Sequence, residues 1–304
     1  MREHSVLSSD TLRWIATSVG AEVRSVQRLA GSTSATLYSV EATRSDHLLK
    51  LVLRLFTNAE WLAEEPGLVR HEAASLAKAA EADVPTPELI ACDESGAHCG
   101  VPAILMTHLP GRVELTPVDL DDWLYKLAEA IIPLHALDLG EFPWRYAPYN
   151  DVSRLEPPNW SKYPDLWERA IEVVNAPWPE VHACFIHRDY HPVNVLWQDG
   201  RVSGIVDWPN ACRGPAGIDV AWCRGNLAEM YGVDVADRFL RACRAIVGPA
   251  FVHHPCWDLL VLIETLPGPP KVYPPWLDFG MQGLTDEIVQ ERVDEYLVSV
   301  MARL

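Results

Sequence analysis

The sequence predicts an α+β protein made of two lobes, with an antiparallel sheet plus a helix in the N-terminal lobe and mainly helices in the C-terminal lobe. Three observations lead to this fold class. Short apolar segments separated by turn formers fill residues 21–110, with one strong helical pattern inserted among them. Helical periodicity dominates the chain after residue 112. Between these regimes, the stretch THLPG at residues 107–111 breaks the pattern and marks the expected hinge.

The composition is that of an ordinary soluble globular protein. The chain has 304 residues, of which 49% are hydrophobic, so it can bury a large core or form two lobes. No run approaches the roughly 18 apolar residues that a membrane span needs, and charges and serines stand where a signal peptide would be apolar. We therefore expect a cytoplasmic protein without a membrane partner, whose seven cysteines are reduced and mostly buried.

The formal net charge of −17 restricts the class of partner. Nucleic-acid binding needs a basic footprint, so we expect no nucleic-acid partner. An acidic surface favours a cationic small substrate, although acidity also serves solubility alone. The sequence leaves the oligomeric state open.

The N-terminal lobe, residues 1–106, should contain a helix, two strands joined by a glycine-containing turn, a third strand, a second helix and two more strands. The expected ranges are 8–20 (capped by Ser9 or Asp10), 23–40, 48–56, 68–82, 89–93 and 101–106. Arg54 lies within the apolar third strand, so its charge needs an anionic partner.

The C-terminal lobe, residues 112–304, should be built mainly from helices. The helical patterns cover residues 117–139, 165–175, 218–230, 235–247 and 285–303. Residues 141–165 are rich in Pro, Trp and Tyr and should be irregular, and the proline-rich residues 267–275 should form a loop that is not helical.

One stretch of the C-terminal lobe, residues 185–207, carries the residue types that chemistry needs. It reads FIHRDYHPVNVLWQDGRVSGIVD and places Asp189, Asn194 and Asp207 at the ends of short strands joined by tight turns. The pattern His-Arg-Asp, four residues, Asn is the catalytic-loop signature of kinases, in which a later Asp supplies a second metal ligand.

These motifs resemble those of the aminoglycoside phosphotransferase and choline kinase-like family, small-molecule kinases with a protein-kinase-like fold. The resemblance runs from about residue 21 to 230 and is strongest at HRDYHPVN (187–194), IVDW (205–208) and GPAGID (214–219). Only eleven residues separate Asp207 from Asp219, which leaves no room for the activation segment of a protein kinase. His191 also stands where Ser/Thr protein kinases usually carry Lys. A small-molecule kinase is therefore the better interpretation.

The resemblance implies a role for each polar residue of this stretch. Asp189 would orient and deprotonate the acceptor hydroxyl. Asn194 and Asp207 would bind Mg²⁺ with hard oxygen ligands. His187 and Asp219 would brace the catalytic loop rather than react.

The resemblance also implies a site for ATP or GTP as co-substrate. Arg54 would hold the phosphates in place of the usual lysine, with Glu72 as its ion-pair partner and Lys50 as the competing choice. The remaining candidates are Gly31, Ser32, Thr33 and Ser34 in the phosphate loop, and Met106, Thr107 and Leu109 at the hinge.

The acceptor should be a small molecule with a hydroxyl group, bound by the C-terminal third of the chain. Aminoglycosides fit the acidic balance, macrolides fit the twelve tryptophans, and a metabolite such as choline, homoserine or a sugar is an equal competitor. An inactive nucleotide-binding module is the less favoured alternative. The candidate acceptor-binding residues are Trp257, Asp258, Glu264, Tyr273, Trp276 and Asp278.

Overall fold

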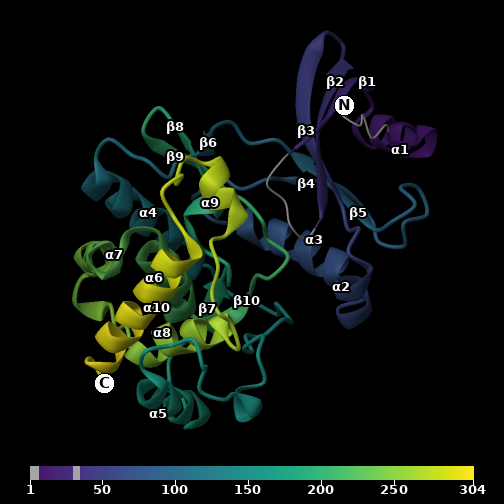
Figure 1. The fold of residues 1–304 in the computed structure, drawn as a ribbon. Helices are drawn as coiled ribbons and strands as arrows, with labels where there is room; N and C mark the ends of the chain where they lie inside the picture. Colours follow the sequence, from purple (N-terminus) through teal and green to yellow (C-terminus); the bar gives the residue numbers. More distant parts are fainter. Residues whose placement is uncertain (1–6, 30–34) are drawn as a thin grey trace. The chain divides into compact units, whose positions relative to one another are not determined.

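The computed structural model describes residues 7–29 and 35–304. The chain divides into two compact units (Figure 1). The first comprises Met1–Pro110 with Trp208–Asn210, and the second comprises Gly111–Asp207 with Ala211–Leu304. The largest sheet lies in the first unit and most helices lie in the second, so the predicted α+β class is confirmed. No helix in the described ranges is long and apolar enough to cross a membrane.

The first unit is built on a five-stranded antiparallel sheet in the order β1-β2-β3-β5-β4. Alternate residues of the second strand, Tyr38, Val40 and Ala42, are buried because successive side chains of a strand point to opposite faces. Ile15 and Val19 of the first helix join the same core. The strands are β1 (Glu22–Arg28), β2 (Thr36–Arg44), β3 (His47–Leu55), β4 (Leu89–Asp93) and β5 (Ala103–Thr107).

Three helices accompany this sheet: α1 (Ser9–Val19), α2 (Ala59–Glu64) and α3 (Leu68–Ala79). The cap of α1 is Ser8, whose hydroxyl accepts a hydrogen bond from the N–H of Thr11, and not Ser9 or Asp10 as predicted. The sequence did not predict α2, because six residues are too few for a helical period to show. Asn58 caps α2 by accepting from two backbone N–H groups.

The second unit is mainly helical, with two small sheets, β6-β8-β9 and β7-β10. Helix α6 is buried on nearly all sides and contacts α7, α8 and α10. The helices are α4 (Leu120–His135), α5 (Pro164–Asn175), α6 (Ala216–Tyr231), α7 (Val233–Val247), α8 (Pro255–Leu262), α9 (Pro274–Asp278) and α10 (Asp286–Met301). The strands are β6 (Arg112–Val113), β7 (Ala183–Ile186), β8 (Val195–Gln198), β9 (Arg201–Ile205) and β10 (Cys212–Pro215).

The predicted loop over residues 267–275 is wrong at its C-terminal end. Pro274 and Pro275 form the first turn of α9, where a helix tolerates proline because the missing N–H would have no intrahelical partner. The eight-residue α8 was also missed, because it is buried on nearly all sides and its apolar residues show no period.

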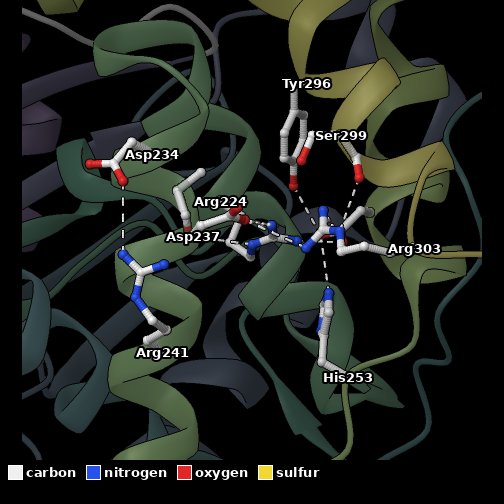
Figure 2. Close-up of polar contacts among 10 residues, drawn as sticks. Arg224, Asp234, Asp237, Arg241, His253, Tyr296, Ser299 and Arg303 are labelled. Atoms are coloured by element: carbon white, nitrogen blue, oxygen red, sulfur yellow. Dashed lines mark hydrogen bonds and ion pairs between the residues drawn. The ribbon is translucent and has the colours of Figure 1, made fainter.

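A buried polar cluster joins four helices of the second unit (Figure 2). Arg224 of α6 is fully enclosed and forms ion pairs with Asp258 of α8 and, at 2.6 Å, with Asp237 of α7. The hydroxyl of Tyr296, on α10, donates to Asp258 at 2.9 Å. Burial opposes the ionisation of Asp258, yet the contacts with His253 and Arg224 outweigh it and hold the pKa of this carboxyl well below its ordinary value.

Candidate active site

The predicted catalytic loop is anchored by Asp219, in the first turn of α6. This loop follows β7, and its first two backbone N–H groups donate to the Asp219 carboxylate: His187 at 2.9 Å and Arg188 at 2.7 Å. The ring of His135, on α4, also contacts Asp219 at 2.9 Å. Arg188 has a φ of 69°, a left-handed conformation that costs a non-glycine residue free energy. These bonds stabilise the loop in that conformation.

His187 joins the catalytic loop to the strand end that carries Asp207. Its Nδ1 lies 3.3 Å from the backbone nitrogen of Asp189, so Nδ1 must accept. Its Nε2 therefore carries the hydrogen and donates to the carbonyl oxygen of Val206 at 2.9 Å. Both ring nitrogens of His187 therefore make hydrogen bonds to the backbone.

Asn194 has an amide whose orientation is determined by its neighbours. Its Nδ2 lies 2.9 Å from the carbonyl oxygen and 3.3 Å from the carboxylate of Asp189, and 3.2 Å from Nε2 of His191. Only the NH₂ group can donate to these three acceptors, so Oδ1 is directed away from them. The carbonyl oxygen of Asn194 also accepts from the N–H of Val206 at 2.9 Å, which brings Asn194 beside the residue that precedes Asp207.

The carboxylates of Asp189 and Asp207 repel one another electrostatically in this site. Burial raises the pKa of the Asp189 carboxyl to about 7, and the negative charge of Asp207 adds to the rise. Burial also lowers the pKa of His191 to about 4, so this imidazole is neutral near pH 7. Asp207 has a φ of 71°, just after the end of β9. A pair of like charges of this kind is stabilised when a cation lies between them.

The residues present fit a magnesium ion. Asn194 and Asp207 offer the hard oxygen atoms that Mg²⁺ prefers, and Mg²⁺ takes only one or two protein ligands when phosphates supply others. Within residues 7–29 and 35–304, no group of three or more His, Cys, Asp or Glu side chains is arranged as a metal site. That finding is compatible with this ion, because the candidate set contains an amide and relies on phosphate.

In the first unit, the ion pair expected between Arg54 and Glu72 is present. Arg54 Nη1 on β3 donates to Glu72 Oε1 on α3 at 2.9 Å, and only 4% and 1% of the two side chains is exposed. The guanidinium also lies 5.3 Å from the ring centroid of Phe56. Lys50, the competing candidate, is exposed. A charge buried to this degree needs its partner, which explains the tight contact.

The other nucleotide candidates are described only in part. Gly31, Ser32, Thr33 and Ser34 lie outside the described residues. Met106 is buried in β5, and Thr107 ends that strand with its N–H and its hydroxyl both bonded to the backbone of Glu88. Leu109 follows and is half-buried.

The candidate acceptor residues separate into two groups, and three of them are corrected. Trp257, Trp276 and Asp258 are at most 2% exposed, so they belong to the interior and not to an acceptor surface. Trp257 packs on Gly217, and Asp258 belongs to the buried cluster of Figure 2. The sequence could not separate these roles, because tryptophans and carboxylates serve cores and sites alike.

The remaining three candidates keep an accessible position. Glu264 accepts hydrogen bonds from the backbone N–H groups of Tyr149 at 2.8 Å and Asn150 at 3.2 Å. The ring of Tyr273 stands edge-on to that of His191, with 6.3 Å between centroids. Asp278 is exposed at the end of α9.

Sequence reasoning missed the contact between Tyr149 and the side chain of Arg188, which precedes Asp189 in the chain. The guanidinium carbon of Arg188 is 3.9 Å from the centroid of the Tyr149 ring. The irregular segment that carries Tyr149 has no periodic signal, so nothing in the sequence alone singles it out.

Comparison with known proteins assigns this geometry to a family. A model of the phosphotransferase enzyme family (APH) matches residues 25–253, which is more than half of the chain. The chain belongs to the phosphotransferase enzyme family. An aminoglycoside 3'-phosphotransferase of Enterococcus faecalis is 26% identical to this family member over 119 residues, a stretch that covers 34% of this chain and only 45% of that protein.

Solved structures of other phosphotransferases share the fold. One is the aminoglycoside phosphotransferase APH(4)-Ia in a ternary complex with ADP and hygromycin B, with a TM-score of 0.63, 16% identity and coverage of 96% of this chain and 99% of that one. Another is the macrolide 2'-phosphotransferase MphH of Brachybacterium faecium, with a TM-score of 0.53, 17% identity and coverage of 95% and 98%. The predicted protein-kinase-like fold is therefore confirmed for this phosphotransferase family member.

Proposed function

We propose that this protein transfers the γ-phosphate of ATP or GTP to a hydroxyl of a small molecule, with an aminoglycoside- or macrolide-type antibiotic as the leading acceptor class. The observation that carries the proposal is the arrangement of Asp189, Asn194 and Asp207 in one braced loop system. Membership of a phosphotransferase family supports the reaction class. The relatives named above, which act on aminoglycosides or macrolides, support the choice of antibiotics.

Asp189 is proposed as the residue that orients the acceptor hydroxyl and accepts its proton. Only the ionised carboxylate can do so, and the fraction of ionised Asp189 increases as the pH rises through its pKa of about 7. His187 and Asp219 fix the loop backbone, and they therefore determine where the carboxylate lies. These separate roles suit phosphoryl transfer, in which catalysis depends mostly on positioning and electrostatic stabilisation.

Asn194 and Asp207 are proposed as the protein ligands of Mg²⁺. The amide of Asn194 is held with Oδ1 directed away from its three acceptors, so it is prepared to bind a cation. When bound, the ion would neutralise the negative charge of the phosphates. Arg54 is proposed to hold the nucleotide phosphates, with Glu72 fixing the guanidinium.

The functional division of the chain stays a prediction. We propose residues 1–106 as the nucleotide lobe, residues 107–111 as the hinge and residues 112–304 as the catalytic and acceptor lobe. Gly31, Ser32, Thr33 and Ser34 remain candidates for the phosphate loop. Met106, Thr107 and Leu109 remain candidates for the purine contacts, which would use backbone atoms.

A phosphorylation screen tests the proposal. The purified protein is incubated with Mg²⁺ and γ-labelled ATP or GTP, together with aminoglycosides, macrolides, choline, homoserine or simple sugars. We expect transfer of label to an antibiotic and its loss in Asp189→Asn. The matched control is Asp199→Asn, an exposed turn position with a φ of 51° that asparagine tolerates.

Each result of the screen has a definite meaning. Turnover of choline, homoserine or a simple sugar with none on antibiotics would replace the antibiotic by a metabolic acceptor. Absence of both nucleotide hydrolysis and a magnesium-dependent thermal shift with ATP or GTP in the wild type would remove the enzyme proposal. Equal activity of Asp189→Asn and Asp199→Asn would remove Asp189 from its role.

A further inference from the structure

Tyr149 is an aromatic residue that is exposed and yet fixed in place. It keeps 48% of its surface accessible. One side of the ring meets the guanidinium of Arg188, 3.9 Å from the ring centroid. The ring also stands edge-on to Trp222 of α6, at 6.5 Å between centroids and an interplanar angle of 74°. Two contacts of this kind restrict the rotation of a side chain that solvent alone would leave free.

The backbone that carries Tyr149 is held as firmly as its ring. Both oxygens of Glu264 accept from this backbone, one from the N–H of Tyr149 and one from that of Asn150. The side chain of Asn150 donates to the carbonyl oxygens of Ile263 at 2.8 Å and Leu266 at 3.2 Å. Loops usually vary and move, so this number of tertiary bonds on an exposed aromatic residue calls for a functional explanation.

Arg188 connects Tyr149 to the catalytic loop. Its N–H is bound by Asp219, its Nη2 donates to the carbonyl oxygen of Ala147 at 2.6 Å, and its chain neighbour is Asp189. The residue that stacks on Tyr149 is therefore the direct chain neighbour of Asp189.

We propose that Tyr149 is an acceptor-binding residue whose exposed ring stacks on the face of a hydroxylated ring of the acceptor. This inference rests on the proposed function and deepens it. The C–H face of a sugar or cyclitol ring suits a fixed aromatic platform. An ammonium group does not suit it, because the guanidinium charge already lies 3.9 Å from the ring centroid and like charges repel.

The inference commits to a class of acceptor. Aminoglycosides and macrolides both carry sugar rings, and the platform would accept either. Choline and homoserine have no ring to stack. Among the compounds of the phosphorylation screen, the ring-bearing acceptors should therefore be preferred over the acyclic alcohols.

Steady-state kinetics on two Tyr149 variants test the inference, with hygromycin B, erythromycin, choline and homoserine as acceptors. Tyr149→Ala should raise the KM for the ring-bearing acceptor by about tenfold, which corresponds to the loss of one aromatic contact. Its KM for MgATP should stay within about twofold of that of the wild type, because nucleotide and acceptor contacts are separate. Tyr149→Phe keeps the ring and should retain the acceptor KM. Tyr125→Ala, at a 44% exposed tyrosine of α4, is the matched control for loss of an exposed ring.

Three results would overturn the inference. The first is an unchanged acceptor KM in Tyr149→Ala, and the second is an equal loss in Tyr149→Phe, which would assign the effect to the hydroxyl. The third is the absence of transfer to both ring-bearing compounds, whether or not choline or homoserine is turned over. If the wild type still hydrolyses nucleotide in a magnesium-dependent manner in this third case, the stacking role of Tyr149 is rejected but the proposed reaction is not. If hydrolysis is absent as well, both are rejected.

Discussion

Asp219 Oδ1 accepts a hydrogen bond from the backbone N–H of Arg188 at 2.7 Å, although 31 positions separate the two residues in the chain. The second oxygen of the same carboxylate binds the N–H of His187 at 2.9 Å. A fully buried aspartate at the start of α6 therefore determines the backbone path of the catalytic loop. The conformation of Asp189 depends on a residue that touches no substrate in the proposed reaction.

Asp219→Ala should destabilise the protein and impair the catalytic loop together. Two backbone N–H groups, a buried one on His187 and a partly buried one on Arg188, would lose their acceptor, which should lower the free energy of unfolding by about 3 kcal/mol. Asp219→Asn should cost less, since its carbonyl oxygen can still accept from one of them. Urea denaturation measures the first effect and turnover of nucleotide the second.

The control for this prediction is Glu168→Ala, at an exposed position of α5. It should leave the unfolding free energy within about 0.5 kcal/mol of the wild type. Equal stability of Asp219→Ala and Glu168→Ala would contradict the bracing role of Asp219.

Asp189→Asn should stabilise the protein at high pH in the absence of Mg²⁺. The pKa of Asp189 in the folded state is raised to about 7 by burial and Asp207, whereas an unfolded aspartate titrates near about 3.9. The folded state therefore binds more protons between these values, and the contribution of Asp189 to stability is present at low pH and lost as pH rises through about 7. Asparagine mimics the neutral form at every pH.

Urea denaturation of wild type and Asp189→Asn at several pH values checks this sign. The variant should be more stable by about 2 kcal/mol at pH 8, a figure reduced because solvent reaches 27% of the Asp189 side chain. The difference should shrink as pH falls from about 7 toward about 4. A difference that does not depend on pH would contradict the raised pKa.

The closeness of the three candidate residues could be predicted from the sequence because they share one short stretch, whereas Asp219, which holds the backbone of the loop, lies outside that stretch. Asp189, Asn194 and Asp207 fall within one stretch in which two short strands and two tight turns follow one another. In such a stretch, spacing along the chain largely determines spacing in space. For Arg54, the sequence itself required only an anionic partner, because the arginine lies in an apolar strand; the family resemblance named Glu72, which is 18 positions away on α3.

The acceptor site proposed around Tyr149 could not be predicted, because tertiary contacts assemble it. Glu264 reaches the N–H of Tyr149 across 115 positions, and no local pattern encodes that contact. Asp258 and Trp257 have the residue types of a binding site, but burial decides their role, and burial depends on how α6 and α8 pack.

Arg54→Lys should raise the apparent KM for ATP and lower turnover, because an ammonium keeps the charge but loses the planar contact geometry of guanidinium. We expect an effect of about tenfold on kcat/KM, the equivalent of one weakened charged hydrogen bond. Lys50→Ala is the matched control on the same strand, at an exposed position, and should leave both constants unchanged. The opposite result, with an unchanged Arg54→Lys and an impaired Lys50→Ala, would transfer the phosphate role to Lys50.

Two glycines of α6 should respond to alanine in opposite ways. A Cβ at Gly217 would lie 2.2 Å from Trp257 Cδ1, on a ring that is itself buried and cannot move aside without disturbing α8. Gly217→Ala should therefore lower the free energy of unfolding by about 2 kcal/mol through overpacking. It should also lower turnover, because Gly217 lies two residues before Asp219, which braces the catalytic loop.

Gly225→Ala is the internal control for this prediction, because its Cβ would lie 3.5 Å from Val261 Cγ1, an ordinary van der Waals contact. Alanine in a helix interior is more favourable than glycine by about 0.5–1 kcal/mol, so this variant should be as stable as the wild type or more stable. Urea denaturation of the two variants side by side measures both effects. Equal unfolding free energies would show that the contact between α6 and α8 at Trp257 tolerates an additional methyl group. Unchanged turnover of Gly217→Ala would show that the start of α6 can shift without loss of the loop that Asp219 holds.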